Sequence, residues 1–437
     1  MVQYDTFFYL YTREIASNMD QLPLITLGSL LFVIIVGILK PKLNIGILAF
    51  AVAMIIGFMV MELKEGEISS LFPSQLFLML VGVTLFFGIA EQNGSLAKIL
   101  HVMIRLTKGN TAILPISFFF LTFILSAIGP GNIAATALIA PVAMVVAAKT
   151  GVSTLLMAIM VCTGANAGAF SPISPTGIVS TGLITKIGAT DHNYPMQIFL
   201  AAAGIQSISA AAAYVIFKGY VVSKKNTDIT SLIGTEPLAL TTSQIATFVA
   251  MLILLVSTVF LKTPVVVLAF LLAGFLLMLN WGDSEEAIKR IPWDAILLIT
   301  GISVLVGIMG KAGGINLAAN LIATVSSPLT LNAILALITG IISAYSSSSG
   351  VVMPTFIPMI PSIMEKVGTT DLLPTIIAVN VGSHMVDVSP LSTLGAICIS
   401  CVTGSVAKKR LFNQLMIWGI AMAFVGAGLS FVFLDLM

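Results

Sequence analysis

The sequence has little charge: Lys, Arg, Asp and Glu make up 9% of its 437 residues, whereas soluble proteins carry roughly 25%. Hydrophobic residues make up 58%, and the mean hydropathy is +1.09. So few charged side chains cannot cover a water-exposed surface, which excludes a soluble globular domain. The formal net charge of +2 offers no strongly basic surface, so no nucleic-acid partner is expected.

Cysteine is also scarce, with three residues in the chain. Cys398 and Cys401 form a C-x-x-C pattern, but the surrounding segment is apolar and holds no second pair or nearby His to complete a zinc site. We interpret both as small buried side chains and predict no cofactor. The first 25 residues lack the pattern of a cleavable signal peptide, so no removable leader is expected.

Long apolar segments make up most of the sequence. Eight runs are long enough to cross a bilayer, which takes about 20 residues: 23–39, 44–61, 74–92, 196–217, 244–261, 264–280, 293–310 and 411–436. Four further apolar stretches are interrupted by Gly, Pro, Ser and Asn: 112–147, 152–187, 329–364 and 372–403. The sequence therefore predicts an all-α polytopic membrane protein with about 11 spanning segments.

The chain also repeats itself. "SPISPTG" at 171–177 and "SPLSTLG" at 389–395 share the motif Ser-Pro-x-Ser-x-x-Gly at an offset of 218. Two other blocks recur in the same order at offsets of 219 and 217. A fixed period of this kind indicates a duplicated fold. We predict an N-terminal extracytoplasmic segment (1–22), a first repeat (23–217), a cytoplasmic linker (218–243) and a second repeat (244–437).

Orientation follows from Lys and Arg, which favour cytoplasmic loops. If 112–147 and 329–364 each return to their starting side, 14 of the 20 basic residues lie in the cytoplasm. The two halves then begin on opposite sides of the membrane. The sequence thus predicts inverted repeats, each with a re-entrant hairpin and a broken transmembrane helix.

Inverted repeats with broken helices are typical of secondary transporters that bind substrate near the bilayer midplane. The hairpin tips, "SAIGPGN" at 126–132 and "SAYSSSSG" at 343–350, and the helix breaks at 164–177 and 382–395 supply hydroxyl, amide and free backbone groups. Helix starts attract anions and helix ends attract cations. No Lys or Arg occurs within the hairpins or between 149 and 186, so we expect a carboxylate to be held by dipoles and hydroxyls. The alternative is that these small residues only permit close helix packing.

Two titratable side chains, His384 and Asp387, lie in the second break. Ionisable groups within the membrane are functional candidates by default. The alternative is structural, with Asp387 capping the following half-helix or His384 pointing into a packed seam. Glu91, at the end of an apolar run, is expected at the membrane interface.

Taken together, these motifs resemble the divalent anion:sodium symporter family of the ion transporter superfamily. "GNIAATALIAP" at 131–141 is similar to that family's first hairpin, and the two Ser-Pro loops are similar to its substrate loops. "SSSSGVVMPTFIP" at 346–358 resembles most closely the malonate and dicarboxylate carrier (MatC-type) branch. The resemblance covers roughly 72–403.

The resemblance implies a sodium-coupled carrier of a small carboxylate, of the malonate or C4-dicarboxylate class, with protons as the alternative coupling ion. It implies elevator-type transport by a homodimer in the inner (cytoplasmic) membrane. Scaffold helices would lie near 23–61 and 244–280, and transport elements near 112–187 and 329–403. Gly131 and Ile133 replace hydroxyl residues of the first hairpin motif, and Ser348, Ser349 and Gly350 replace the second motif. These departures leave the cation stoichiometry open.

The implied site residues come from both hairpins and both loops. For the substrate they are Asn132, Ser171, Ser174, Thr176, Ser348, Ser349, Ser389, Ser392 and Thr393. For sodium, held partly by backbone oxygens, they are Gly131, Asn132, Phe170, Ser346, Ser349 and Val388. His384 and Asp387 are the candidates for proton coupling.

Two other functions stay open. A cation/proton antiporter would use His384 and Asp387 as ion carriers. An intramembrane hydrolase would use Ser389 as nucleophile with those two residues, although three such groups in one short break align poorly for catalysis. We therefore expect a transporter rather than an enzyme.

Overall fold

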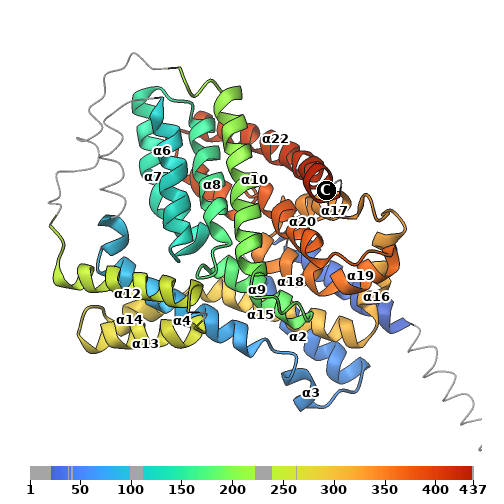
Figure 1. Ribbon diagram of the computed structural model, residues 1–437. Helices are drawn as coiled ribbons and strands as arrows, with labels where there is room; N and C mark the ends of the chain where they lie inside the picture. The colour runs from blue at the N-terminus through green and yellow to red at the C-terminus, as the bar shows by residue number, and fades with distance from the viewer. Residues whose placement is uncertain are drawn as a thin grey trace, which may run out of the picture.

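The structure is a computed structural model that describes residues 21–37, 39–40, 43–98, 112–221, 239–261 and 263–435. Within these ranges every regular element is helical, as predicted (Figure 1). Most of the predicted segment 1–22 and of the predicted linker 218–243 lies outside the described residues. So do seven basic residues of the charge count: Arg13, Lys42, Arg105, Lys108, Lys224, Lys225 and Lys262.

The described helices of the two halves follow one another in a similar order. The first half has Gln21–Gly37, α2 (Ile45–Ile55), α3 (Glu65–Ser69), α4 (Ser74–Gln92), α6 (Ile113–Ala127), α7 (Gly131–Thr150), α8 (Thr154–Ala169), α9 (Pro175–Lys186) and α10 (Tyr194–Ile216). The second has α12 (Thr242–Val259), α13 (Val265–Met278), α14 (Ser284–Lys289), α15 (Trp293–Lys311), α16 (Gly314–Ala323), α17 (Leu331–Ser343), α18 (Met353–Phe356), α19 (Ile360–Val367), α20 (Leu372–Met385), α21 (Thr393–Ser400) and α22 (Ser405–Ser430). By position in the series, α15 corresponds to α4, α17 to α6, and α20 and α21 to α8 and α9.

Backbone conformation agrees at matched glycines. Gly94 and Gly313, 219 residues apart, follow α4 and α15 with φ of +78° and +79°. Gly151 and Gly368, 217 apart, end α7 and α19 with φ of +77° and +81°. Glycine adopts this left-handed conformation without a Cβ clash. The repeated sequence therefore folds with the same local geometry.

Both predicted helix breaks are present. α8 ends at Ala169 and α9 begins at Pro175, which suits the first turn of a helix. α20 ends at Met385 and α21 begins at Thr393. The residues between them, 170–174 and 386–392, contain the first four residues of each Ser-Pro motif, so each motif interrupts the helix that carries it.

The second serine of each loop closes the break in the same way. Ser174 Oγ donates to the backbone oxygen of Ala169, and Ser392 Oγ donates to that of Asp387. Because the last carbonyls of a helix have no partner within it, these bonds satisfy groups that the break would leave unpaired.

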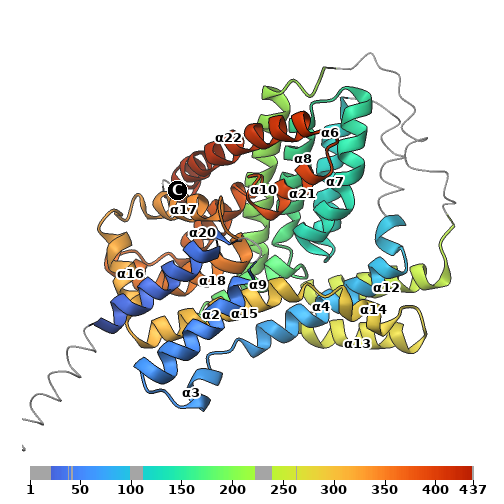
Figure 2. The same cartoon turned by 180° about the vertical axis from the view of Figure 1, so that it is seen from behind.

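The helices form two crossing groups. α2, α4, α12, α13, α14 and α15 lie across one end of a bundle that contains α6, α7, α8 and α10 (Figure 1). Within the first group α2 packs against α15, while α13 packs against α4. From the other side, α21 of the second half lies beside α7 of the first (Figure 2). The halves are therefore interlocked rather than side by side.

Five helices in the described residues are long and apolar enough to cross a membrane: Ser74–Gln92, Gly131–Thr150, Tyr194–Ile216, Trp293–Lys311 and Ser405–Asp435. A sixth span arises if Leu331–Ser343 and Ser348–Val367, bent by 119°, count as one. Large apolar side chains such as Leu271 and Met278, 65% and 72% exposed, suit contact with lipid. The chain is thus a multi-pass membrane protein, and the number of 11 spans stays a prediction.

Candidate functional site

The first hairpin tip lies between the last turn of α6 and the first turn of α7. Gly129 and Gly131 adopt φ of +134° and +83°, which a residue with a Cβ rarely adopts. A Cβ on Gly129 would overlap the ring of Phe87 in α4, and one on Gly131 would lie 2.8 Å from Pro175 Cδ. These close approaches seat the tip against α4 and against the start of α9.

The second hairpin tip lies between α17 and a π-helical turn at Ser348–Val352. The Ser347 hydroxyl accepts a 3.0 Å hydrogen bond from the Gly350 amide and caps this turn. A Cβ on Gly350 would lie 2.5 Å from the side chain of Leu298 in α15. Each tip is therefore seated on one of the two corresponding helices, α4 and α15.

A narrow cavity of about 20 Å³ lies where the two tips meet the second loop. The residues that line it are Asn132, Ile133, Ser346, Ser347, Ser348, Ser349, Asp387, Ser392, Thr393 and Leu394. A cavity of this size holds about one water molecule or one small ion. Seven of the predicted site residues are thus brought together from three segments of the chain.

Within the described part of the chain, Asp387 is the one acidic side chain that lines this cavity. It is 7% exposed. Ser348 Oγ donates to Asp387 Oδ1, and Asn166 Nδ2 lies 3.3 Å from Asp387 Oδ2. Hydrogen bonds to both oxygens stabilise a carboxylate. The cavity therefore contains a buried acid with polar partners and no basic residue along its described lining.

Asn166 connects this acid to the first hairpin. Asn132 Nδ2 donates to Asn166 Oδ1 at 2.8 Å, and Asn166 Nδ2 also donates to the backbone oxygen of His384 at 2.9 Å. Asn166 is fully buried in α8 and was not among the predicted site residues. The repeat could have pointed to it, because Asn166 occupies the same repeat position as the candidate His384, at an offset of 218.

His384 lies behind the cavity rather than in its lining. Its Nδ1 is 2.8 Å from the Asn380 backbone oxygen and 3.1 Å from Ser383 Oγ. Its ring contacts that of Phe170 edge to face, with centroids 4.7 Å apart. Its Nε2 is buried without a hydrogen-bond partner among the described residues. The ring is thus held by the Nδ1 hydrogen bond and by packing against Phe170, with Nε2 available for a proton or a water molecule.

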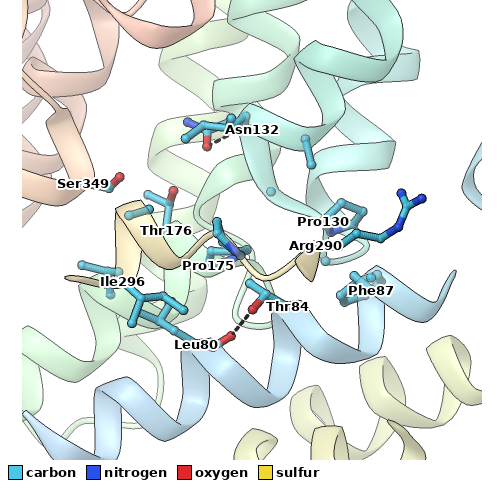
Figure 3. A pocket seen from close by; sticks show the side chains of 18 of the residues that line it. Leu80, Thr84, Phe87, Pro130, Asn132, Pro175, Thr176, Arg290, Ile296 and Ser349 are labelled. Atoms are coloured by element: carbon cyan, nitrogen blue, oxygen red, sulfur yellow. Dashed lines mark hydrogen bonds between the residues drawn. The ribbon is translucent and has the colours of Figure 1, made fainter. Parts of the chain in front are cut away.

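A larger cavity of about 180 Å³ adjoins the first tip (Figure 3). Gly131, Asn132, Thr176 and Ser349 of the predicted site line it, together with apolar side chains of α4 and α15. Asn132, Ile133 and Ser349 line both cavities, so the two spaces share one boundary. Glu91 and Arg290 also line the larger cavity. We expected Glu91 at the membrane interface and a carboxylate held by dipoles and hydroxyls, so neither Glu91 nor Arg290 was among the predicted site residues.

Other predicted residues lie beside these cavities and make internal contacts. Ser389 Oγ donates to the Ala344 backbone oxygen at 3.2 Å, which ties the second loop to the second tip. Ser171 accepts backbone and side-chain bonds from Ser174 through its carbonyl. Phe170 and Val388, expected near sodium, are 1% exposed. These residues shape the loops around the lining.

The cysteines do not form a C-x-x-C site. Cys398 Sγ lies 3.7 Å from Cys162 Sγ in α8, and both side chains are fully buried. Among the described residues, no group of three or more His, Cys, Asp or Glu side chains is placed to hold a metal ion. Any cation at the tips would depend on hydroxyl, amide, backbone and Asp387 oxygens.

Residues 20–169 match the family model for the dicarboxylate carrier protein MatC N-terminus. This match covers the first hairpin and α8, and it confirms the resemblance to the MatC-type branch. The family description names a carrier, which agrees with the expected membrane transporter. No curated protein matches the chain at a significant level.

Proposed function

We propose that this protein is a cation-coupled secondary transporter of small dicarboxylates, and that the two adjoining cavities at the hairpin tips are its binding site. The observation that carries the proposal is their shared boundary at Asn132, Ile133 and Ser349. One space suits a single ion and the other a small organic molecule, so two ligands of opposite charge would meet at this boundary. Such contact makes the binding of one depend on the other.

The narrow cavity is the proposed cation site. It offers the Asp387 carboxylate, the serine hydroxyls of 346–349 and the Asn132 side chain. Hard cations such as sodium favour oxygen ligands of this kind. Sodium is the proposed coupling ion, and protonation of Asp387 is the alternative way to neutralise the same buried charge.

The larger cavity is the proposed carboxylate site. Thr176 stands at the start of α9, where free backbone amides attract anions, and Ser349 supplies a hydroxyl from the opposite half. Predominantly apolar walls with a few polar groups are usual for small-molecule sites. A sodium ion in the adjoining narrow cavity would partly neutralise the charge of a bound carboxylate.

The transport cycle that we propose is an elevator movement in a homodimer of the inner membrane. The crossing of the α2–α4–α13–α15 group with the α6–α8–α10 bundle supports a division into scaffold and transport bodies (Figure 1). Inverted repeats are supported by the matched loops and by the exchanged packing of α2 on α15 and α13 on α4. Alternating access in such folds is largely a rigid-body movement around a fixed site.

A cation/proton antiporter is the second candidate, because Asp387 and His384 are buried within one network. The described residues give the intramembrane hydrolase no supporting geometry. Ser389 Oγ donates to Ala344, whereas His384 Nδ1 faces Asn380 and Ser383. A nucleophile bonded to its base is the arrangement that such an enzyme requires.

Uptake into proteoliposomes tests the proposal. The full chain is reconstituted, and entry of radiolabelled malonate and succinate is measured with and without an inward sodium gradient at constant pH. We expect saturable, sodium-stimulated uptake that Asn132→Ala makes insensitive to sodium. Ser207→Ala, exposed on α10, is the matched control. Exchange of sodium for protons without carboxylate entry would favour the antiporter and overturn the proposal.

A further inference from the structure

We propose that Arg290 recruits dianionic substrate into the larger cavity, and that Glu91 limits this attraction. The inference rests on the proposed function and adds the substrate's charge class. Of the described residues that line this cavity, Arg290 is the one cationic side chain and Glu91 the one anionic side chain. Neither belongs to the hairpins or loops from which the site was predicted.

The two charges form an ion pair at the exposed edge of the cavity. Arg290 Nη1 donates to Glu91 Oε1 at 2.7 Å, and the side chains are 37% and 50% exposed. Arg290 lies beside Pro130 and Phe87, on the side of the cavity away from Ser349 (Figure 3). An anion entering at this edge would meet the guanidinium before it reaches the polar residues at the opposite end.

The backbone around the pair is held firmly. Arg290 directly follows α14 as its C-cap residue, and its amide donates to the Glu286 and Ala287 oxygens. A Cβ on Gly88 of α4 would lie 3.2 Å from the Ala287 oxygen and 3.4 Å from Arg290 Cβ, so the absence of a side chain there lets α14 approach. Packing thus fixes the backbone and Cβ of Arg290 beside α4, and the bond to Glu91 holds the guanidinium.

A guanidinium has five N–H donors, and the bond to Glu91 uses one nitrogen. The remaining donors suit a carboxylate, which arginine binds in a two-pronged geometry. Glu91 competes for the same group. Removal of Glu91 should therefore strengthen anion capture, whereas removal of Arg290 should weaken it. A purely structural ion pair would lose stability in both cases.

The charge also predicts discrimination between substrates. Coulomb attraction grows with the charge of the ligand, so a dianion should gain more from Arg290 than a monoanion of similar shape. Malonate and its monomethyl ester differ by one charge on nearly the same skeleton. The ratio of their affinities therefore reports the effect of the Arg290 charge, and a change in protein stability alone does not alter it.

The experiment measures malonate uptake into proteoliposomes at saturating sodium, with ionic strength raised by choline chloride. We expect Arg290→Gln to raise KM about tenfold, within the range of electrostatic steering, with little change in the maximal rate. Arg290→Lys, which keeps the positive charge, should have a KM close to that of the wild type, and Glu91→Gln should have a lower KM. Screening by salt should raise the wild-type KM but not the KM of Arg290→Gln, in which Glu91 is the charge that remains.

Lys289→Gln is the matched control, because Lys289 is the adjacent residue, is 58% exposed and pairs with Glu285 and Glu286 outside the cavity. Its KM should equal that of the wild type. Unlabelled malonate and its monomethyl ester are also compared as inhibitors of labelled malonate uptake. The preference for malonate over the ester should fall in Arg290→Gln and not in Lys289→Gln.

Two results separate failure of this inference from failure of the proposed function. If wild-type uptake is saturable but KM and its salt dependence are unchanged in both Arg290→Gln and Glu91→Gln, the recruiting role is wrong and the carrier function stands. If the wild type takes up no dicarboxylate, both are overturned. Should Arg290→Gln fail to fold, an unchanged KM in Glu91→Gln is sufficient to reject the inference.

Discussion

Asn166 donates a 2.9 Å hydrogen bond to the backbone oxygen of His384, and the two residues occupy the same position in the two halves of the chain, 218 apart. In a pair of two-fold-related units, a residue that contacts its own counterpart lies on the axis. The Asn132 and Asp387 side chains both bond to Asn166. The narrow cavity therefore adjoins the point where the halves meet.

A second pair of contacts is exchanged between the halves. Cys162 lies 3.7 Å from Cys398, and Asn380 Nδ2 donates to Ser180 Oγ at 2.8 Å. Asn380 is the counterpart of Cys162, and Ser180 that of Cys398, both at an offset of 218. The same pair of repeat positions is thus in contact twice, with different side chains, as the proposed inverted repeats would require.

Replacement of Asp387 by Asn should abolish the dependence of sodium affinity on pH. The ionised carboxylate binds sodium and the protonated acid does not, so in the wild type the apparent sodium affinity should rise as pH rises. The amide of the variant carries no charge at any pH, so its sodium affinity should be weak and flat. The measurement is uptake against sodium concentration at several pH values. A wild-type sodium affinity that does not change with pH would remove Asp387 from cation coupling.

Ser349→Ala should weaken substrate binding more than Ser171→Ala. Ser349 lines both cavities, whereas Ser171 lies within its loop. A hydrogen bond to a charged group contributes about 1.5–3 kcal/mol, which corresponds to roughly 10- to 150-fold in affinity. Binding of malonate to the purified variants by calorimetry provides the comparison. Equal losses in both variants would mean that the first loop also touches substrate.

Gly177→Ala should destabilise the protein. A Cβ at this position would overlap the Ser171 backbone oxygen, and overpacking of this kind costs about 1–3 kcal/mol. Gly204→Ala on α10 is the control, because nothing lies within 4 Å of its added Cβ. Thermal unfolding in detergent should show a lower Tm for the first variant and an unchanged or higher Tm for the second. A wild-type Tm for Gly177→Ala would mean that the first loop is loosely packed.

Oxidation should join Cys162 to Cys398 without stopping transport. The two thiols are adjacent and fully buried, so a membrane-permeant oxidant is required, and each thiol loses one hydrogen as the sulfur–sulfur bond forms. α8 and α21 both belong to the proposed transport body, which moves as a unit. The bond is detected by loss of maleimide labelling after denaturation, with Cys401→Ser removing the third thiol. Complete arrest of uptake by this bond would contradict an elevator in which α8 and α21 move together.

The helical membrane fold and the positions of its breaks were predictable from sequence, because they follow from local chemistry. Low charge and long apolar runs require backbone groups to pair within helices. Proline and glycine in register mark where those helices are broken, as Pro172 and Pro390 do in the two loops. The repeat offset of 218 linked the two loops before any contact was known.

What the tertiary structure decided was which polar groups share a space. Asn166 reads as one polar residue in an apolar helix, and only the packing of α8 against α20 brings it to Asp387. Arg290 lies outside every predicted site segment, yet the fit of Gly88 against α14 places it at the cavity. Sequence fixes a residue's neighbours along one helix, whereas a site between crossing helices depends on how they pack, which no local pattern records.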